Sequence, residues 1–393
     1  MCVQFFVGPT LAYNGLDEYQ YVHYKMKVSE DVYFGYAIPA LLSFILALHL
    51  YAGKLKGEIV DQEKTTLFVR KNPLLPYYFI GIGFVSSILA SFFSSDFGLV
   101  FYLLSSFKFV GLFLLVIGGS ELKLLPMVLV VSSIVGSSLG GGMFHDLLTW
   151  LIFIGAVFGI KYKFGFNTKL IGCTIFILMA TIIQVLKSGY RGAIGNATED
   201  AGIETFATVY EEQNESQSIF SFERLAPATV RINQGFIITN IMNNVPAKEP
   251  FSRGEEMYQV FEAAVMPRIL APDKLRAGDR TVFMKYSGLR IRPGTSMGLS
   301  SVGDAYLNYG IVGGCIFMFL LGLLYSGILN VFHKQSFKYP ALILFLPMIF
   351  YYPIRPDCEL QTILGHLFKA IFLISCIVIF FKRNFLVESE PIK

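Results

Sequence analysis

Apolar residues in this chain are grouped into long blocks, and this grouping constrains the fold more than any other feature of the sequence. The blocks run for about 16 to 24 residues, and a helix needs about 20 to cross a hydrocarbon core of roughly 30 Å. Only 15% of the 393 residues are charged, against roughly 25% in a soluble domain. Because the blocks lack the polar face of a soluble core helix, we predict an all-α, polytopic membrane protein.

About nine spans are expected where apolar blocks alternate with turn residues and charges. Residues 1–187 are predicted to form an N-terminal bundle of six spans, and residues 306–393 a C-terminal bundle of three. Between them, residues 188–305 form a large, partly helical loop. The N-terminal 14 residues are interpreted as the stump of a further span or as an apolar tail. The expected spans are 33–52, 76–95, 97–119, 123–141, 146–162, 169–187, 306–332, 339–354 and 362–381.

Lysine and arginine are divided unequally between the two sets of short loops, and this division predicts the orientation. One set contains fourteen basic residues and the other only Lys25, Lys27 and Arg355. The positive-inside rule places the richer set in the cytoplasm. The N-terminus and residues 188–305 are then extracytoplasmic, and the C-terminus is cytoplasmic.

The long loop prefers arginine to lysine. Nine of the twelve arginines lie in residues 188–305, together with only three lysines. A guanidinium grips phosphate or carboxylate with two parallel hydrogen bonds, which a lysine cannot do. Salt bridges with the fourteen acids of the same loop are the alternative for any single arginine. For the set, we predict a polyanionic ligand at the outer face of the membrane.

The sequence SSVGDAYLNYGIVGG (300–314) leads into the seventh expected span. Asp304 and Asn308 are four residues apart and share a helical face at the mouth of the bundle. Asp304 either caps its own helix or takes part in chemistry. Gly310 and Gly314 have the small-xxx-small spacing that is typical of closely packed membrane helices.

Other charged or metal-binding side chains give weaker signals. Lys108 and Lys369 lie within expected spans, where a snorkelling side chain or a structural pair is expected. His366, one helical turn before Lys369, could line the same cavity. The five histidines are scattered and the cysteines form no C-x-x-C pair, so no metal and no cofactor are expected. The sequence predicts no nucleic-acid partner.

Two stretches, PFSRGEEMYQVFEAAVMPRILAPDK (250–274) and TSMGLSSVGDAYLNYGIVGG (295–314), resemble bacterial oligosaccharide repeat unit polymerases, the O-antigen polymerase family. The shared pattern is a glycine-led helix, a Pro-Arg step, a proline loop with a basic residue, and a Gly-Asp-x-Tyr-x-Asn-Tyr-Gly entry to a span. YPIRPD (352–357) is similar to the loop before the last span of that family. These elements are Gly254, Pro267–Arg268, Pro272–Lys274, Gly303, Asp304, Tyr306, Asn308, Tyr309, Gly310, Arg355 and Asp357.

The resemblance implies a glycosyltransferase in the bacterial inner membrane, acting in lipopolysaccharide or capsule biosynthesis. Its substrate would be an oligosaccharide on undecaprenyl diphosphate, held among membrane lipids. A chain-length regulator protein is a candidate partner. Arginines would hold the donor diphosphate without a metal, and a carboxylate or histidine would accept the proton of the acceptor hydroxyl. The expected catalytic residues are Asp304, Arg268 and Arg355, and the expected substrate-binding residues are Arg191, Arg224, Lys274, Arg290, Tyr306 and Asn308.

Two other functions stay open from the sequence. A lipid-linked glycan ligase would share most of these features. A transporter or flippase of an anionic lipid-linked glycan is the alternative from another class, although such proteins tend to contain internal repeats and interrupted spans, and neither is visible in the sequence.

Overall fold

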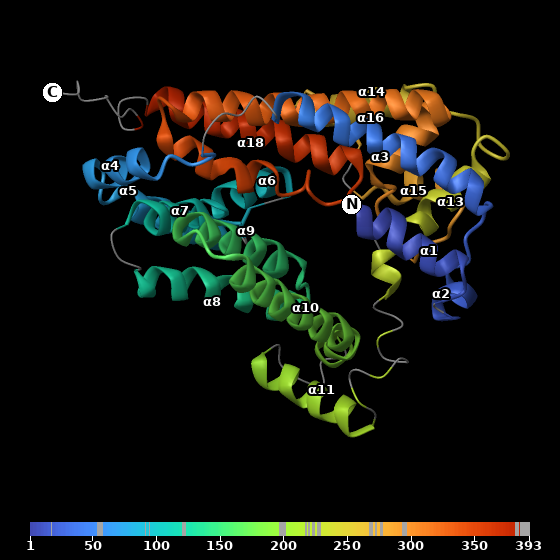
Figure 1. Ribbon diagram of the computed structural model, residues 1–393, viewed down its shortest axis with the longest axis horizontal. Helices are drawn as coiled ribbons and strands as arrows, with labels where there is room; N and C mark the ends of the chain where they lie inside the picture. The colour runs from blue at the N-terminus through green and yellow to red at the C-terminus, as the bar shows by residue number, and fades with distance from the viewer. Residues whose placement is uncertain are drawn as a thin grey trace. The chain divides into compact units, whose positions relative to one another are not determined.

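In a computed structural model of the chain, all regular secondary structure of the described residues is helical, which confirms the all-α prediction (Figure 1). The N-terminal half of the chain is described almost continuously, and the longer gaps fall in the long loop and at the C-terminus. The described residues are 1–16, 18–52, 58–90, 92–93, 95–119, 123–195, 202–216, 218, 221, 225, 229–266, 270–271, 273–275, 278–292, 297–381 and 385.

The helices vary from single turns to 37 residues, and most of the longest coincide with the apolar blocks of the sequence. The shorter helices lie at the N-terminus and in the long loop. In chain order the elements are η1 (Val3–Val7), α1 (Gly8–Tyr13), α2 (Glu18–His23), α3 (Glu30–Ala52), α4 (Gln62–Lys71), α5 (Leu75–Leu89), α6 (Ser95–Ser105), α7 (Phe107–Gly118), α8 (Leu124–Gly141), α9 (His145–Tyr162), α10 (Phe166–Gly195), α11 (Ile203–Ser216), η2 (Val230–Ile232), α13 (Gly235–Asn244), α14 (Glu255–Val265), α15 (Arg280–Ser287), α16 (Ser300–Ser336), η3 (Pro340–Phe345), α17 (Leu346–Ile349) and α18 (Leu360–Phe380).

Seven helical segments of the described chain are long and apolar enough to cross a membrane, and α4 with α5 would make an eighth if this pair, bent by 82°, counts as one span. The protein is therefore a polytopic membrane protein. The expected span at 339–354 differs from the others, because only Pro340–Ile349 is helical there. Its first part is a 3-10 helix (η3), and turns follow α17.

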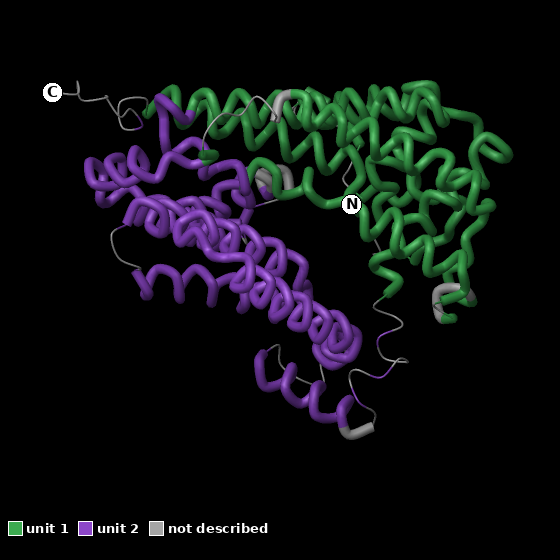
Figure 2. Tube along the Cα trace, viewed as in Figure 1, with its two compact units in different colours: residues 1–59, 229–335, 348–382 green, residues 60–228, 336–347, 383–393 purple. Residues whose placement is uncertain are grey.

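Two compact units make up the structure, and each is assembled from segments far apart in the sequence (Figure 2). Unit 1 contains residues 1–59, 229–335 and 348–382, and unit 2 contains residues 60–228, 336–347 and 383–393. The sequence-based divisions at 187/188 and 305/306 fall inside α10 and α16, because each of these helices runs on past the end of its apolar block.

In unit 1, α3 lies beside α16 and both helices run in the same direction (Figure 1). The Tyr36 hydroxyl donates to the Val302 carbonyl (2.7 Å), and the Ser326 hydroxyl donates to the Leu48 carbonyl (2.8 Å). A Cβ added at Gly322 would approach the Phe44 carbonyl oxygen to 2.5 Å, so the helix backbones are close there. Gly322 therefore packs closely against α3, as small residues in membrane helices often do.

The N-terminal residues of unit 1 form short helices that pack against α3 and α13. Phe5 is fully buried, and its carbonyl accepts a hydrogen bond from the Tyr33 hydroxyl (2.9 Å). Gly8 is so close to the Ile232 carbonyl that no larger residue would fit. The segment is thus an integral part of unit 1.

In unit 2, every residue of α7 is buried, so this helix is the centre of the unit. Trp150 of α9 stacks on Phe109 of α7, with the ring centroids 3.7 Å apart. The Lys161 ammonium donates to the carbonyls of Ile117 and Gly119, at 2.8 and 3.1 Å. A cation there stabilises the C-terminal end of α7, where carbonyls lack helical partners.

Candidate functional site

The first ten residues of α16 form a separate helical segment, which we call the entrance segment (residues 300–309). The helix is broken at Gly310, whose backbone has φ 67° and ψ −159°. This conformation is essentially restricted to glycine, because a Cβ would clash with the neighbouring backbone. The glycine that the sequence assigns to helix packing is therefore required by the break, while Gly314 does pack, against the Tyr36 ring.

A loop from the preceding part of unit 1 covers the broken end. The backbone N–H groups of Ser252 and Arg253 donate to the carbonyls of Leu307 and Asn308, at 3.0 and 3.1 Å. A continuous helix would satisfy these carbonyls with its next turn, so the loop replaces the partners that the break removes. Arg253 and Gly254 adopt positive φ values of 53° and 94° to make this approach.

The same loop fixes the start of α14. The Ser252 hydroxyl accepts from the Glu256 N–H (2.8 Å), and the Asn308 side-chain oxygen accepts from the Met257 N–H (3.3 Å). The side-chain nitrogen of Asn308 in turn donates to the Asp304 carbonyl (2.9 Å). Asn308 therefore connects α14 to the entrance segment, which is a structural task for a residue that the sequence assigned to substrate binding.

Asp304 caps a helix, although not its own. Its Oδ2 accepts from the backbone N–H of Leu360, the first residue of α18, at 2.7 Å. The N-cap residue of α18 is Glu359, and its side chain makes no capping hydrogen bond. Asp304, only 9% exposed, supplies the acceptor that an N-cap side chain would normally provide.

The Glu359 carboxylate does not cap α18 and accepts hydrogen bonds from two other groups. Its Oε1 accepts from the Thr362 hydroxyl (3.0 Å) and from the Gly278 N–H, which belongs to the long loop. Burial raises the pKa of the Glu359 carboxyl, these two hydrogen bonds oppose the rise, and the nearby Asp279 adds to it. The start of α18 is therefore bound both to the entrance segment and to the loop.

Only one oxygen of the Glu256 carboxylate has partners among the described residues. Its Oε1 accepts from the Tyr286 hydroxyl at 3.0 Å and lies 3.6 Å from the Lys285 ammonium. Its Oε2 is buried and has no hydrogen-bond partner among the described residues. A buried carboxylate oxygen without a donor is costly, so its retention calls for an explanation.

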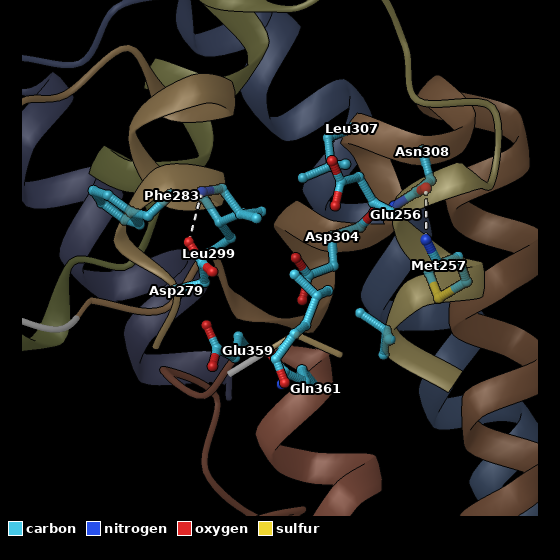
Figure 3. Close-up of a pocket in the computed structure, with 13 residues that line it drawn as sticks. Glu256, Met257, Asp279, Phe283, Leu299, Asp304, Leu307, Asn308, Glu359 and Gln361 are labelled. Carbon is cyan, nitrogen blue, oxygen red and sulfur yellow. Dashed lines mark hydrogen bonds between the residues drawn. The ribbon is translucent and has the colours of Figure 1, made fainter. Parts of the chain in front are cut away.

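These carboxylates surround one small pocket (Figure 3). Figure 3 shows the carboxyl groups of Glu256 and Asp304 directed into the space between α14, α15 and the entrance segment. The cavity has a volume of about 30 Å³, which is enough for one or two water molecules. No lysine or arginine is among the described lining residues, and the described residues contain no acid, histidine or cysteine cluster with metal-binding geometry. The polar lining residues are Glu256, Asp279, Asp304, Asn308, Glu359 and Gln361.

The basic residues expected at the site are dispersed. Lys274 donates to the Ala263 carbonyl (3.2 Å) and to the Met266 carbonyl, so it caps the end of α14. Arg290 is exposed, and Arg191 belongs to unit 2, where its side chain lies against Gly142. Arg268 and Arg224 lie outside the described residues.

Arg355 is the expected basic residue that lies in the same loop as a pocket carboxylate. Its guanidinium is 3.4 Å from Asp357 and lies over the Tyr352 ring, 5.2 Å from the centroid. Its Nε is buried without a hydrogen-bond partner among the described residues. Tyr306, by contrast, is packed between the Tyr36 and Phe251 rings and so supports the pocket wall.

Three lining acids were not anticipated from the sequence, namely Glu256, Asp279 and Glu359. Two of them had a usable signal. Glu256 lies two residues after the Gly254 that carries the resemblance, and Glu359 lies two residues after the Arg355–Asp357 loop. Asp279 had none beyond its ability to cap α15, which it does by accepting from the Thr281 N–H (2.8 Å).

Comparison with known proteins gives one match. A family model described as a domain of unknown function (DUF8712) matches residues 75–337, more than half of the chain. The matched stretch contains α14, α15 and the entrance segment, and it ends before Glu359. No curated protein matches the chain, and no solved structure does.

Proposed function

The chain belongs to the DUF8712 family, and we propose that it is a glycosyltransferase that polymerises lipid-linked oligosaccharide repeat units. In this proposal the growing glycan is transferred from undecaprenyl diphosphate to the sugar of the next lipid-linked unit. The reaction takes place at the outer face of the bacterial inner membrane, where the positive-inside rule puts the long loop.

One observation carries the proposal: the three sequence blocks that resemble the polymerases meet in unit 1. The Gly254-led helix supplies Glu256, the entrance segment supplies Asp304, and the loop with Arg355 leads directly to Glu359. Glu256 and Asp304 belong to two of the blocks and Glu359 lies two residues after the third, yet these carboxylates line one pocket. Hydrophobic packing alone would not require acids from three distant parts of the chain to converge.

The chemistry of the pocket suits an acceptor sugar. Carboxylates accept hydrogen bonds from sugar hydroxyls, and a suitably placed carboxylate can remove the proton of the attacking hydroxyl. The pocket has room for a hydroxyl group but not for a whole sugar, so the acceptor would insert only its reactive edge. The rest of the repeat unit would lie outside this pocket.

The donor diphosphate requires cationic groups. Arg355 suits this role because its guanidinium is held by Asp357 and Tyr352 while its Nε has no partner among the described residues. Such a group can stabilise the charge that develops on the leaving diphosphate without a metal ion. Arg268 and Arg224 are assigned the same task from the sequence alone.

A deletion strain tests the proposal. Without the gene, single repeat units should replace long chains on the lipid carrier or the cell surface, and the wild-type gene should restore the ladder of chain lengths. Persistent long chains that are no longer attached to their final acceptor would point to a ligase. In that event the polymerase proposal is wrong.

A second function is favoured by a specific observation, the break of α16 at Gly310. Interrupted helices with polar groups at the break are typical of transporters, where they bind the substrate or the coupling ion. A flippase of lipid-linked glycans would then be the alternative. Accumulation of repeat units on the cytoplasmic leaflet of the deletion strain would support it.

A further inference from the structure

Each pocket acid has one oxygen engaged by the protein, and the acids differ in what that oxygen holds and in whether the other oxygen is buried without a donor. Asp304 has Oδ2 bound to the amide of Leu360, and Glu359 has Oε1 bound to two donors. Asp279 has Oδ1 bound to two amides at the start of α15. These bonds hold helix ends, so proton transfer at those oxygens would loosen the scaffold.

The engaged oxygen of Glu256 contacts side chains only, and its second oxygen is buried without a donor among the described residues. Oε1 takes the whole anchoring role, through the Tyr286 hydroxyl and the Lys285 ammonium. Oε2 is the buried oxygen with no partner among the described residues, and Glu256 lines the pocket. The side chain as a whole is 13% exposed. An oriented carboxylate with one open oxygen matches the geometry of a general base, which must meet the hydroxyl within hydrogen-bond reach.

The residues that orient Glu256 are themselves fixed. Tyr286 is 3% exposed and ends α15, where the Asn244 side chain donates to the carbonyls of Lys285 (2.8 Å) and Tyr286 (3.1 Å). At the other end, the Ser252 hydroxyl holds the backbone of Glu256. Contacts from α13, from α15 and from the loop before α14 therefore determine where Oε2 lies.

We propose that Glu256 is the general base of this chain, with Tyr286 and Lys285 as positioning residues, which rests on the glycosyltransferase function proposed above. Glu256 Oε2 takes the proton of the acceptor hydroxyl while the acceptor oxygen bonds to the anomeric carbon of the donor sugar. The bond between that carbon and the diphosphate oxygen breaks, and undecaprenyl diphosphate leaves with the electron pair. Tyr286 keeps Oε1 in place through its hydroxyl.

The test uses full-length protein in membranes of the deletion strain, which supply the lipid-linked repeat units as the probe. Glu256→Gln should lower the rate of chain formation about 10²- to 10⁴-fold, as expected for loss of a general base. Glu255→Gln is the matched control, because Glu255 is the preceding, exposed residue of the same helix turn. Its rate should equal that of the wild type.

The rate per amount of folded protein in the membrane separates catalysis from folding. Tyr286→Phe removes the hydrogen bond that orients Oε1, so this rate should fall, though less than in Glu256→Gln, while the amount of folded protein is unchanged. A purely structural role would lower the amount of folded protein and leave the rate per folded protein unchanged. If Glu256→Gln fails to accumulate in the membrane, Tyr286→Phe decides the question alone.

The outcomes of this experiment distinguish the two proposals. Chain formation by the wild type together with a normal rate for Glu256→Gln would overturn the assignment of the base and leave the function intact. An unchanged rate per folded protein for Tyr286→Phe would overturn it as well. Absence of chain formation by the wild type, in membranes that contain the repeat units, would overturn the function itself.

Discussion

Two apolar helices of this protein, α16 and α7, each carry a buried charged residue, and they accommodate it in different ways. In α16 the helix breaks at Gly310, and Asp304 on the short entrance segment accepts the first amide of α18. In α7 the helix is unbroken and wholly buried, and the Lys108 ammonium lies 5.6 Å from the centroids of the Phe84 and Phe109 rings. The carboxylate therefore organises other elements, while the lysine is enclosed by aromatic rings.

This difference shows what turns a buried charge into part of a site. Around Asp304, backbone groups freed by a break are satisfied by residues from distant parts of the chain, which brings further acids along. Around Lys108, Gly83 approaches so closely that an added Cβ would lie 2.5 Å from the Lys108 backbone nitrogen. Close packing of this kind encloses the lysine stem and brings no acid to it in the described contacts.

The largest effect is expected when the cation in the loop before α18, Arg355, is altered. Arg355→Lys keeps the charge but loses the planar fork, so chain formation should fall 10²- to 10³-fold, or about 3 to 4 kcal/mol in the transition state. The glycan ladder and membrane level of the variant measure this. Arg231→Lys, at an exposed position outside the expected site, is the control. A normal ladder from Arg355→Lys would remove Arg355 from the diphosphate contact.

The break itself is tested by Gly310→Ala. Alanine is strained at φ 67° and ψ −159°, so the variant should lose about 1 to 3 kcal/mol of stability and most chain formation. Thermal unfolding in detergent provides the measurement. Gly327→Ala lies in the same helix with nothing within 4 Å of the added Cβ, and it should be neutral or slightly stabilising. Equal behaviour of both variants would mean that α16 does not need the break.

A pH-dependent effect is expected at Glu359. Because its pKa is raised in the folded protein, its contribution to stability is full below the pKa of the unfolded chain and is lost as pH rises through the folded pKa. Glu359→Gln keeps an oxygen for Gly278 and Thr362 and should flatten this fall. Unfolding midpoints measured between pH 4 and 8 in steps of about one unit would show it. An unchanged slope would assign the fall to other groups.

The smallest effect is expected in α7. Lys108→Met replaces the buried ammonium with an apolar group of similar length, so stability should be unchanged or higher by about 1 kcal/mol. Chain formation should stay at the wild-type level. A large loss of activity at a normal membrane level would show that Lys108 belongs to a functional site, and the contrast between α7 and α16 would disappear.

The membrane fold could be predicted from the sequence because apolar length is a local property. The blocks at 123–141 and 146–162 became α8 and α9 almost unchanged. The block at 339–354 did not become one long helix, because Pro340 starts a 3-10 helix and Pro353 follows in the turns. Hydropathy does not distinguish these cases, since it records composition and not backbone geometry.

The site could be predicted only in part. Asp304 was identified by its position at a span entrance, but its partner Leu360 is 56 residues away and no local pattern connects them. Arginine enrichment indicated a charged site, yet Arg290 is exposed and Arg191 lies in unit 2. The number of arginines in the loop does not indicate where in the fold each arginine lies. The other three acids that line the pocket, Glu256, Asp279 and Glu359, were recognised only from their convergence.

The hydrogen bond between Asp304 and Leu360 also means that the pocket is completed late in the synthesis of the chain. Ribosomes release a chain from its N-terminus, so the entrance segment leaves the ribosome before α18 has been made. Glu359 and Gln361, which complete the wall of the pocket, leave with α18. The pocket therefore cannot be complete until the last described helix has been inserted, and a nascent chain that stalls before Leu360 lacks part of the pocket wall.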